Sequence, residues 1–249
     1  TTRYGEDLYG ALMLPALLDR LCEIEGVEWL RLLYCYPDRI TDELLDTIAR
    51  QPKVLHYLDI PLQHCDERVL GRMNRTGSRA SLTALIENIR AKIPDIVLRT
   101  TVMTGFPGED EAAFTELAEF VQDIRFDRLG CFAYSPVEGA QANELRNPVP
   151  EAVKEDRRRR FMEKQAEISA RKLARKVGQE LTVLVDEVNP VIKFGKPMGM
   201  QVVARSYADA PEIDGVVRFR AGSGRVVVGD FVKVRITGAC AHDLDAELV

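Results

Sequence analysis

One stretch of the sequence decides the fold class: IVLRTTVMTGFPGE, at residues 96–109. Its first nine residues are rich in β-branched side chains, which favour a strand. Gly105 and Gly108 then allow a tight turn, and Glu109 with the two acidic residues after it suits the positive end of a helix. A strand that runs through a short turn into a helix is the repeating unit of proteins with a parallel sheet.

The same alternation extends on both sides of this stretch. Short apolar runs predict strands at residues 29–35, 54–60, 96–104 and 129–133. Apolar residues at helical spacing predict helices at residues 14–24, 41–48, 82–89 and 109–124. We therefore expect a parallel α/β sheet, either open or closed into a barrel.

The pattern of predicted elements changes after residue 150. Two prolines at positions 148 and 150 end the alternation, and a helix is predicted from Glu151 to Val177, with Gly178 at its end. Five short β-type runs follow, at residues 181–185, 200–204, 215–219, 226–228 and 231–236. This pattern predicts a small all-β barrel, and two domains, 1–178 and 179–249.

Composition narrows the functional classes. The chain has 249 residues and a net charge of −5, which argues against binding nucleic acid or an anionic membrane through net charge. No apolar run is long enough to span a membrane. The five cysteines lie far apart, which predicts reduced thiols of a cytoplasmic protein and no metal site: Cys22, Cys35, Cys65, Cys131 and Cys240.

The segments that follow the predicted strands are the candidate site, because ligands of β/α barrels bind at the carboxyl ends of the strands. These segments are residues 36–39, 61–64, 105–109 and 134–139. The glycines of 105–109 would let a ligand approach backbone N–H groups. The alternative is an ordinary turn between a strand and a helix, and spacing alone leaves both open.

Charged residues inside the predicted strands are a second sign of a site. Arg31, Asp59 and Arg99 interrupt strands that would otherwise be apolar. Our hypothesis is that they line a polar ligand site, and the alternative is a structural ion pair. The run Arg157–Arg160 is interpreted as a solvated helix face.

Several motifs together resemble the radical S-adenosylmethionine (SAM) methylthiotransferase family. They are YLDIPLQH at 57–64 with MNR at 73–75, LRTT at 98–101 leading into GFPGE at 105–109, and FDRLG at 126–130 leading into YSP at 134–136. The last part of the chain resembles a TRAM domain. The resemblance implies a partial TIM-type barrel of the radical SAM kind, followed by a small OB-like TRAM barrel.

Within this family, the resemblance points to the branch that modifies an aspartate of a small-subunit ribosomal protein. YSPVEGA at 134–140 and ADAPEIDG at 208–215 resemble that branch. Residues 179–249 hold eight Lys and Arg against ten Asp and Glu, a net charge of −2 that suits a basic protein better than RNA. The alternatives are a tRNA adenosine methylthiotransferase and a catalytically inert substrate-docking module.

The resemblance also implies cofactors and partners. They are SAM and two four-iron four-sulfur clusters, and none of the cysteines matches a cluster-ligand position. Since the chain lacks the CxxxCxxC motif and an initiator Met, we expect it to be the later part of a longer enzyme, inactive alone. The implied partners are the ribosomal protein and an electron donor, with no membrane and with nucleic acid not expected as the primary partner, for a cytoplasmic monomer.

The SAM pocket implied by the motif positions draws on three segments. Its expected residues are Gln63, His64, Arg99, Thr101, Gly105, Phe106, Pro107, Gly108, Glu109, Tyr134 and Ser135.

Overall fold

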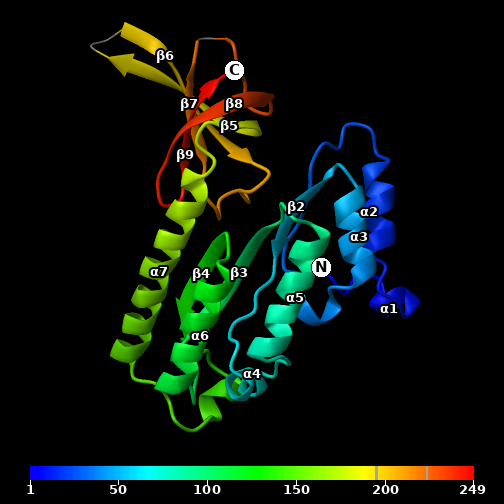
Figure 1. Ribbon diagram of the computed structural model, residues 1–249, viewed down its shortest axis with the longest axis vertical. Coiled ribbons are helices and arrows are strands. Elements are labelled where there is room, and N and C mark those ends of the chain that lie inside the picture. The colour runs from blue at the N-terminus through cyan, green and yellow to red at the C-terminus, as the bar shows by residue number, and fades with distance from the viewer. Residues whose placement is uncertain (194–195, 223) are drawn as a thin grey trace. The chain divides into compact units, whose positions relative to one another are not determined.

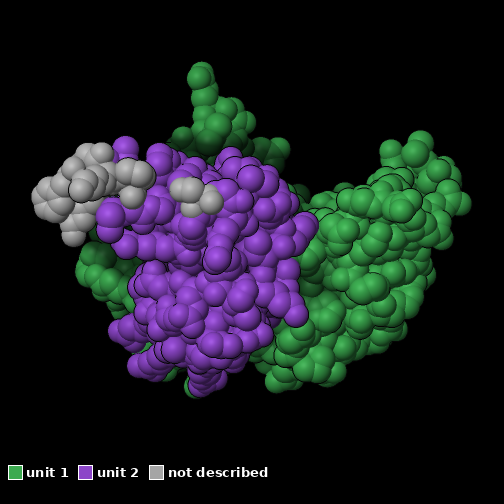
Figure 2. Space-filling view, turned by 90° about the horizontal axis from the view of Figure 1, so that it is seen from above, with its two compact units in different colours: residues 1–165 green, residues 166–249 purple. Residues whose placement is uncertain are grey.

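The structure is a computed structural model that describes residues 1–193, 196–222 and 224–249. The chain divides into two compact units, residues 1–165 and 166–249, which are coloured separately in Figure 2. This division falls within helix α7 (Glu151–Ala174). The domain boundary expected at residue 178 therefore stays a prediction.

Unit 1 contains an open parallel sheet of four strands in sequential order (Figure 1). The strands are β1 (Leu30–Leu32), β2 (Val54–Asp59), β3 (Val97–Thr104) and β4 (Arg128–Ala133). Each corresponds to a strand predicted from the sequence. Asp59 lies opposite Arg99, and Met103 lies opposite Phe132, so the side chains of neighbouring strands stand in rows across the sheet.

Helices precede and connect the strands, and the α-helices that lie between strands begin at side-chain caps. They are α1 (Glu6–Tyr9), α2 (Leu14–Cys22), α3 (Asp42–Arg50), α4 (Glu67–Arg72), α5 (Arg79–Lys92) and α6 (Glu111–Ile124). Two 3-10 helices lie at Pro37–Arg39 and Gln141–Glu144. The hydroxyl of Thr41 accepts the N–H of Leu44, as the sequence predicted, and Asp66, Ser78 and Asp110 cap α4, α5 and α6 in the same way.

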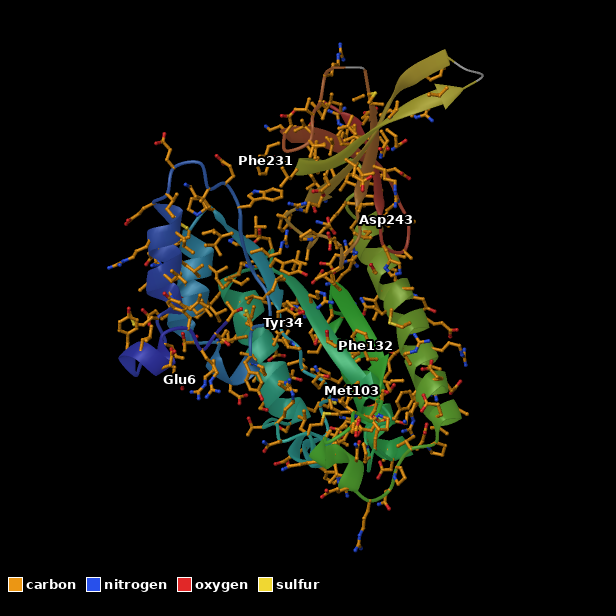
Figure 3. All side chains as sticks on the ribbon, turned by 180° about the vertical axis from the view of Figure 1, so that it is seen from behind. Glu6, Tyr34, Met103, Phe132, Phe231 and Asp243 are labelled. Carbon is orange, nitrogen blue, oxygen red and sulfur yellow. The ribbon has the colours of Figure 1, made fainter. Side chains whose placement is uncertain are left out.

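The two faces of the sheet differ. On β3, the alternate residues Leu98, Thr100 and Val102 are buried. The face that they share packs with apolar residues of α2, α3, α5 and α6 in one core. Arg99, Thr101 and Met103 point to the other face and are only half-buried. Figure 1 shows α5 and α6 in front of the strands, and Figure 3 shows the sheet from behind.

Unit 2 contains a closed barrel with strand order β5-β6-β7-β9-β8. The strands are β5 (Glu180–Lys193), β6 (Lys196–Ser206), β7 (Val217–Ala221), β8 (Phe231–Ala239) and β9 (Leu244–Leu248). The predicted all-β barrel is confirmed, but the strand predicted at 226–228 is wrong. Those residues form a turn in which the N–H of Val227 donates to Asp230, and β9 supplies the fifth strand.

Candidate functional site on the open face of the sheet

The half-buried face of the sheet carries an ion pair between neighbouring strands. Arg99 Nη1 lies 2.8 Å from Asp59 Oδ1, and the two side chains are 15% and 3% exposed. The N–H of Tyr34 donates to the other oxygen of Asp59 at 3.1 Å. The ion pair named as an alternative is therefore present, and it anchors one end of this face.

Further along the strands the same face becomes apolar and more exposed. Thr101 lies opposite Gly130, and Met103 lies opposite Phe132, whose side chain is 60% exposed. Figure 3 labels Met103 and Phe132 side by side on the strands. We call Arg99, Thr101, Met103, Gly130 and Phe132 the open face. It offers a cation, a hydroxyl and an aromatic ring, with no side chain at Gly130 to fill the space between them.

Gln63 extends the edge of this face. It has a left-handed backbone (φ 70°), its N–H donates to Thr101 O, and its carbonyl accepts the N–H of Met103, both at 2.8 Å. The next side chain, His64, is fully buried. Its Nδ1 accepts the N–H of Asp66 at 2.9 Å, which leaves the proton on Nε2, 3.6 Å from Glu109 Oε2. Because it is fully buried, the His64 side chain adds no exposed surface to the open face.

The turn at 105–109 directs most of its N–H groups into the protein. The N–H of Gly105 donates to Glu109 Oε2 at 2.9 Å, that of Gly108 to Asn147 O at 2.8 Å, and that of Glu109 to Phe106 O at 2.9 Å. These groups are engaged by the chain itself. This favours the ordinary turn over a cradle of backbone donors as the role of these residues.

Both glycines of the turn are covered by cations of the chain. A Cβ atom at Gly105 would lie 2.2 Å from Lys154 Cγ, and one at Gly108 would lie 2.3 Å from Arg72 Nη1. Both glycines also have positive φ, 74° and 92°, which other residues adopt only with strain. Gly105 is needed for the close approach of the Lys154 stem, whereas at Gly108 the need comes from the backbone conformation, because the Arg72 guanidinium ends a flexible side chain that can shift.

Glu109 is buried and held by an arginine that sequence reasoning placed in solvent. Arg157 Nη1 lies 2.7 Å from Glu109 Oε1, and both side chains are buried. The interpretation of the arginine run as a solvated face is wrong for Arg157, whereas Arg158 is half-buried and Arg159 and Arg160 are exposed. Lys154, one helical turn earlier, was missed altogether.

The segment after β4 closes the site. The ring of Tyr134 meets that of Phe106 edge-on, with 5.0 Å between the ring centroids, so that this segment and the turn touch. Pro107 is buried in the same turn, and Ser135 is exposed. The structure therefore brings Gln63, the 105–109 turn and Tyr134 together at the carboxyl ends of β2, β3 and β4.

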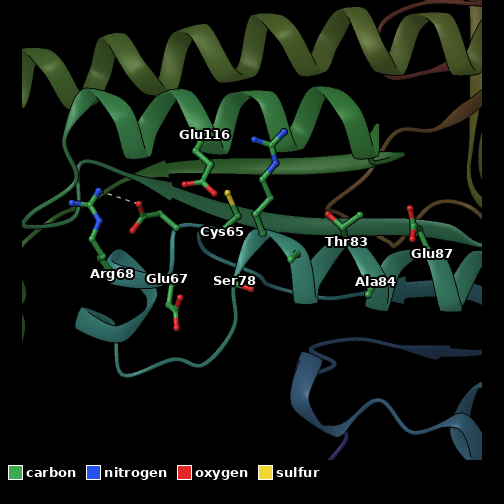
Figure 4. A pocket seen from close by; sticks show the side chains of 11 residues that line it. Cys65, Glu67, Arg68, Ser78, Thr83, Ala84, Glu87 and Glu116 are labelled. Atoms are coloured by element: carbon green, nitrogen blue, oxygen red, sulfur yellow. Dashed lines mark hydrogen bonds and ion pairs between the residues drawn. The ribbon is translucent and has the colours of Figure 1, made fainter.

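A second hollow lies away from these residues. This pocket of 670 Å³ is lined by residues of α4, α5 and α6, and Figure 4 shows Cys65, Glu87 and Glu116 at its wall. Its two guanidinium groups are already paired: Arg68 with Asp66 and Asp110, Arg79 with Glu119 and Asp123. None of the expected SAM-site residues lines it, so we place the candidate site on the open face.

Comparisons with known proteins show the family to which the chain belongs. The radical SAM superfamily model matches residues 5–121, and the TRAM domain model matches residues 177–249. The ribosomal protein uS12 methylthiotransferase RimO of Desulfitobacterium hafniense is 48% identical over 249 residues, which is all of this chain and 54% of that protein. The protein of the same name from Pelotomaculum thermopropionicum is 49% identical over the same coverage. The chain belongs to the radical SAM methylthiotransferase family.

The chain spans about half the length of these family members. A solved structure, coproporphyrinogen III oxidase (HemN) from Escherichia coli, has a TM-score of 0.51 at 17% identity, over 63% of this chain and 37% of that chain. That likeness shows the fold alone. The fold is thus a partial radical SAM barrel followed by a TRAM barrel. Among the described helices, none is long and apolar enough to cross a membrane.

The family's cofactors fit this chain unequally. The open face offers polar and aromatic groups that suit SAM. The cysteines do not suit iron–sulfur clusters, because burial raises the pKa of the Cys35 and Cys131 thiols to about 12 and raises that of Cys65 as well. In the part of the chain that the structure describes, no group of three or more His, Cys, Asp or Glu is placed to hold a metal ion.

Proposed function

We propose that this chain is the SAM-binding and substrate-recognition part of a methylthiotransferase that modifies the β-carbon of an aspartate in ribosomal protein uS12. The observation that supports it best is that three strands of the sheet end close together. Segments of β2, β3 and β4 that carry the family motifs end around one partly exposed surface with polar and aromatic groups, the open face. The names of the relatives supply the substrate.

In this proposal Gln63, Arg99, Thr101, Phe106, Tyr134 and Ser135 face SAM, with the backbone of Gly105, Pro107 and Gly108 beside them. His64 and Glu109, whose side chains are fully buried, give the pocket its shape from behind. One bound SAM would supply the radical that removes hydrogen from the substrate carbon, and a second SAM would supply the methyl group. The residues of this chain orient it and exclude water.

The substrate and the setting are part of the same proposal. Residues 179–249 form the domain that recognises the partner, and their net charge of −2 suits a basic ribosomal protein. The whole enzyme acts in the cytoplasm as a monomer and takes electrons from a separate donor, with its clusters held outside this chain. Nucleic acid is not its primary partner.

A salt series separates this proposal from the tRNA-modifying alternative. The chain is titrated with uS12 and, separately, with a tRNA anticodon stem-loop at increasing salt. We expect binding to uS12 and only weak binding to the stem-loop. Tight binding to the stem-loop that falls steeply with salt, the signature of phosphate contacts, would replace uS12 by tRNA as the substrate.

A titration with SAM separates an enzyme part from a docking module. We expect the chain to bind SAM and the Arg99→Met variant to bind it more weakly. A chain that binds uS12 but not SAM would be a docking module.

A further inference from the structure

We propose that Lys154 and Arg157 are positioning residues that hold the two loops of the pocket, 105–109 and 134–135, from behind. Both residues lie in the first two turns of α7, within unit 1. The pocket as a SAM site rests on the proposed function. The clamp itself rests on contacts that do not involve SAM.

Arg157 fastens the 105–109 turn through Glu109. Its guanidinium donates to Glu109 Oε1 at 2.7 Å and to the backbone carbonyl of Glu109 at 3.2 Å. The second oxygen of that carboxylate accepts the N–H of Gly105 at 2.9 Å. A continuous chain of charge-assisted hydrogen bonds therefore runs from α7 to both ends of the turn.

Arg157 is also fixed in its own place. Its Nη2 atom lies 3.0 Å from Glu111 Oε2, and its guanidinium carbon lies 5.0 Å from the ring centroid of Phe114. Both partners belong to α6, the helix that follows the turn. Because the guanidinium is planar and its donors are directed, these contacts fix the orientation of Arg157 as well as its charge.

Lys154 touches both loops at once. Its stem lies against Gly105, where a Cβ atom would be 2.2 Å from Lys154 Cγ. Its ammonium donates to the backbone carbonyl of Tyr134 at 3.0 Å and to Glu151 at 2.9 Å. The side chain thus spans from the turn to the segment that closes the site.

Packing alone does not explain two buried cations at these positions. Phe161, one turn further along α7, already buries the helix against Phe114, with 5.4 Å between the ring centroids. Buried cations lose hydration, so an apolar side chain would pack at lower cost. Lys154 and Arg157 add directed hydrogen bonds to the loops, which an apolar side chain does not make. We infer that α7 sets the spacing of the two loops.

Three variants of the 249-residue chain test the clamp. Lys154→Met keeps an unbranched stem beside Gly105 and removes the ammonium. Arg157→Lys keeps the charge and loses the paired contacts, and Arg157→Met removes both. Arg159→Met is the matched control, because Arg159 lies on the same helix, is exposed, and pairs with Asp156 and Glu163 of its own helix.

The first readout needs no SAM. Amide exchange at Gly105 and the amide chemical shift of Ser135 are followed by NMR, and thermal unfolding is recorded in parallel. We expect faster exchange at Gly105 in the Arg157 variants, least in Arg157→Lys, and a shifted Ser135 amide in Lys154→Met. Arg159→Met should leave both unchanged. The clamp would be overturned if the Gly105 exchange rate and the Ser135 chemical shift did not change, or changed only in proportion to the loss of global stability.

The second readout is the affinity for SAM. We expect about tenfold weaker binding in Lys154→Met and Arg157→Met, the scale on which outer contacts that orient a site act. Wild-type affinity in both variants would overturn the positioning role. If the variants show the loop changes but the wild-type chain binds no SAM, the proposed function is contradicted and the clamp is still supported.

Discussion

The sheet of unit 1 and the barrel of unit 2 differ in how their faces are covered. The barrel closes on itself, and its interior holds apolar side chains such as Val183, Val202 and Phe219. The parallel sheet is covered by helices on one face, and the other face keeps the Asp59–Arg99 pair half-buried among exposed groups. The interior of this barrel is filled by its own apolar side chains, whereas the open face of unit 1 leaves a surface accessible to a ligand. This difference favours unit 1 as the SAM-binding part in the proposed function.

The largest expected effect comes from breaking the core of unit 1. Phe114 is 1% exposed and packs against Phe161, so Phe114→Ala should cost about 3–5 kcal/mol of stability through the cavity it leaves. Trp29 is the only tryptophan and belongs to unit 1, so its fluorescence in a urea titration reports that unit. We expect the fluorescence midpoint to fall further than the midpoint of β-sheet circular dichroism. Equal shifts would show that the two units unfold together.

A matched pair of arginine variants sharpens the comparison. Arg99→Met leaves the Asp59 carboxylate buried without its cation, which should cost about 3 kcal/mol. Arg218→Met removes an exposed ion pair with Asp243 on the barrel and should cost less than about 1 kcal/mol. Chemical denaturation of both variants measures the difference. Equal losses would mean that the open face is no more buried than the barrel surface.

A smaller effect than the loss of the Arg99 ion pair concerns the cap of α6, next to the turn. The N–H of Ala113 and then the guanidinium of Arg68 lower the pKa of Asp110. Because the folded pKa lies below the unfolded value of about 3.9, this stabilisation is complete above that value and is lost as pH falls through the folded pKa. Asp110→Ala should therefore cost about 1 kcal/mol at pH 7 and less at pH below about 4.

Asp110→Asn is the control for this prediction, because asparagine still caps a helix but carries no charge. It should keep most of the stability at pH 7 and show a weaker dependence on pH than wild type. A cost of Asp110→Ala that stays constant down to acid pH would contradict the ionic part of the account.

The four strands and the longer helices of unit 1 could be predicted because each has a local signal, whereas the short helices α1 and α4 were not predicted. Alternation of apolar runs gave the four strands, and Thr41 gave the start of α3. The direction of the Arg157 side chain had a signal too, which was overlooked. Phe161 and Ile168 mark the buried stripe of α7, and the same spacing continued backward reaches Arg157 and Lys154. The run of four arginines hid that periodicity.

Two features of the barrel and the turn had no reliable local signal. Val226, Val227 and Val228 favour a strand by propensity, but the following Gly229 and Asp230 bend them into a turn. The fifth strand, β9, is different: it reads LDAEL, in which apolar and charged residues alternate as in a half-buried strand, and this short signal was not used. No spacing could show that Lys154 and Arg72 cover the glycines of the turn, because those contacts join segments far apart in the sequence.

The most direct test of the account is a SAM footprint on the chain. Backbone amide signals are followed by NMR as SAM is added, with the pocket between α4, α5 and α6 as the internal alternative. We predict changes at Gln63, Thr101, Phe106 and Tyr134, and none at Glu87 or Glu116 in that pocket. Changes confined to the helix pocket or to the barrel of unit 2 would contradict the assignment of SAM to the open face.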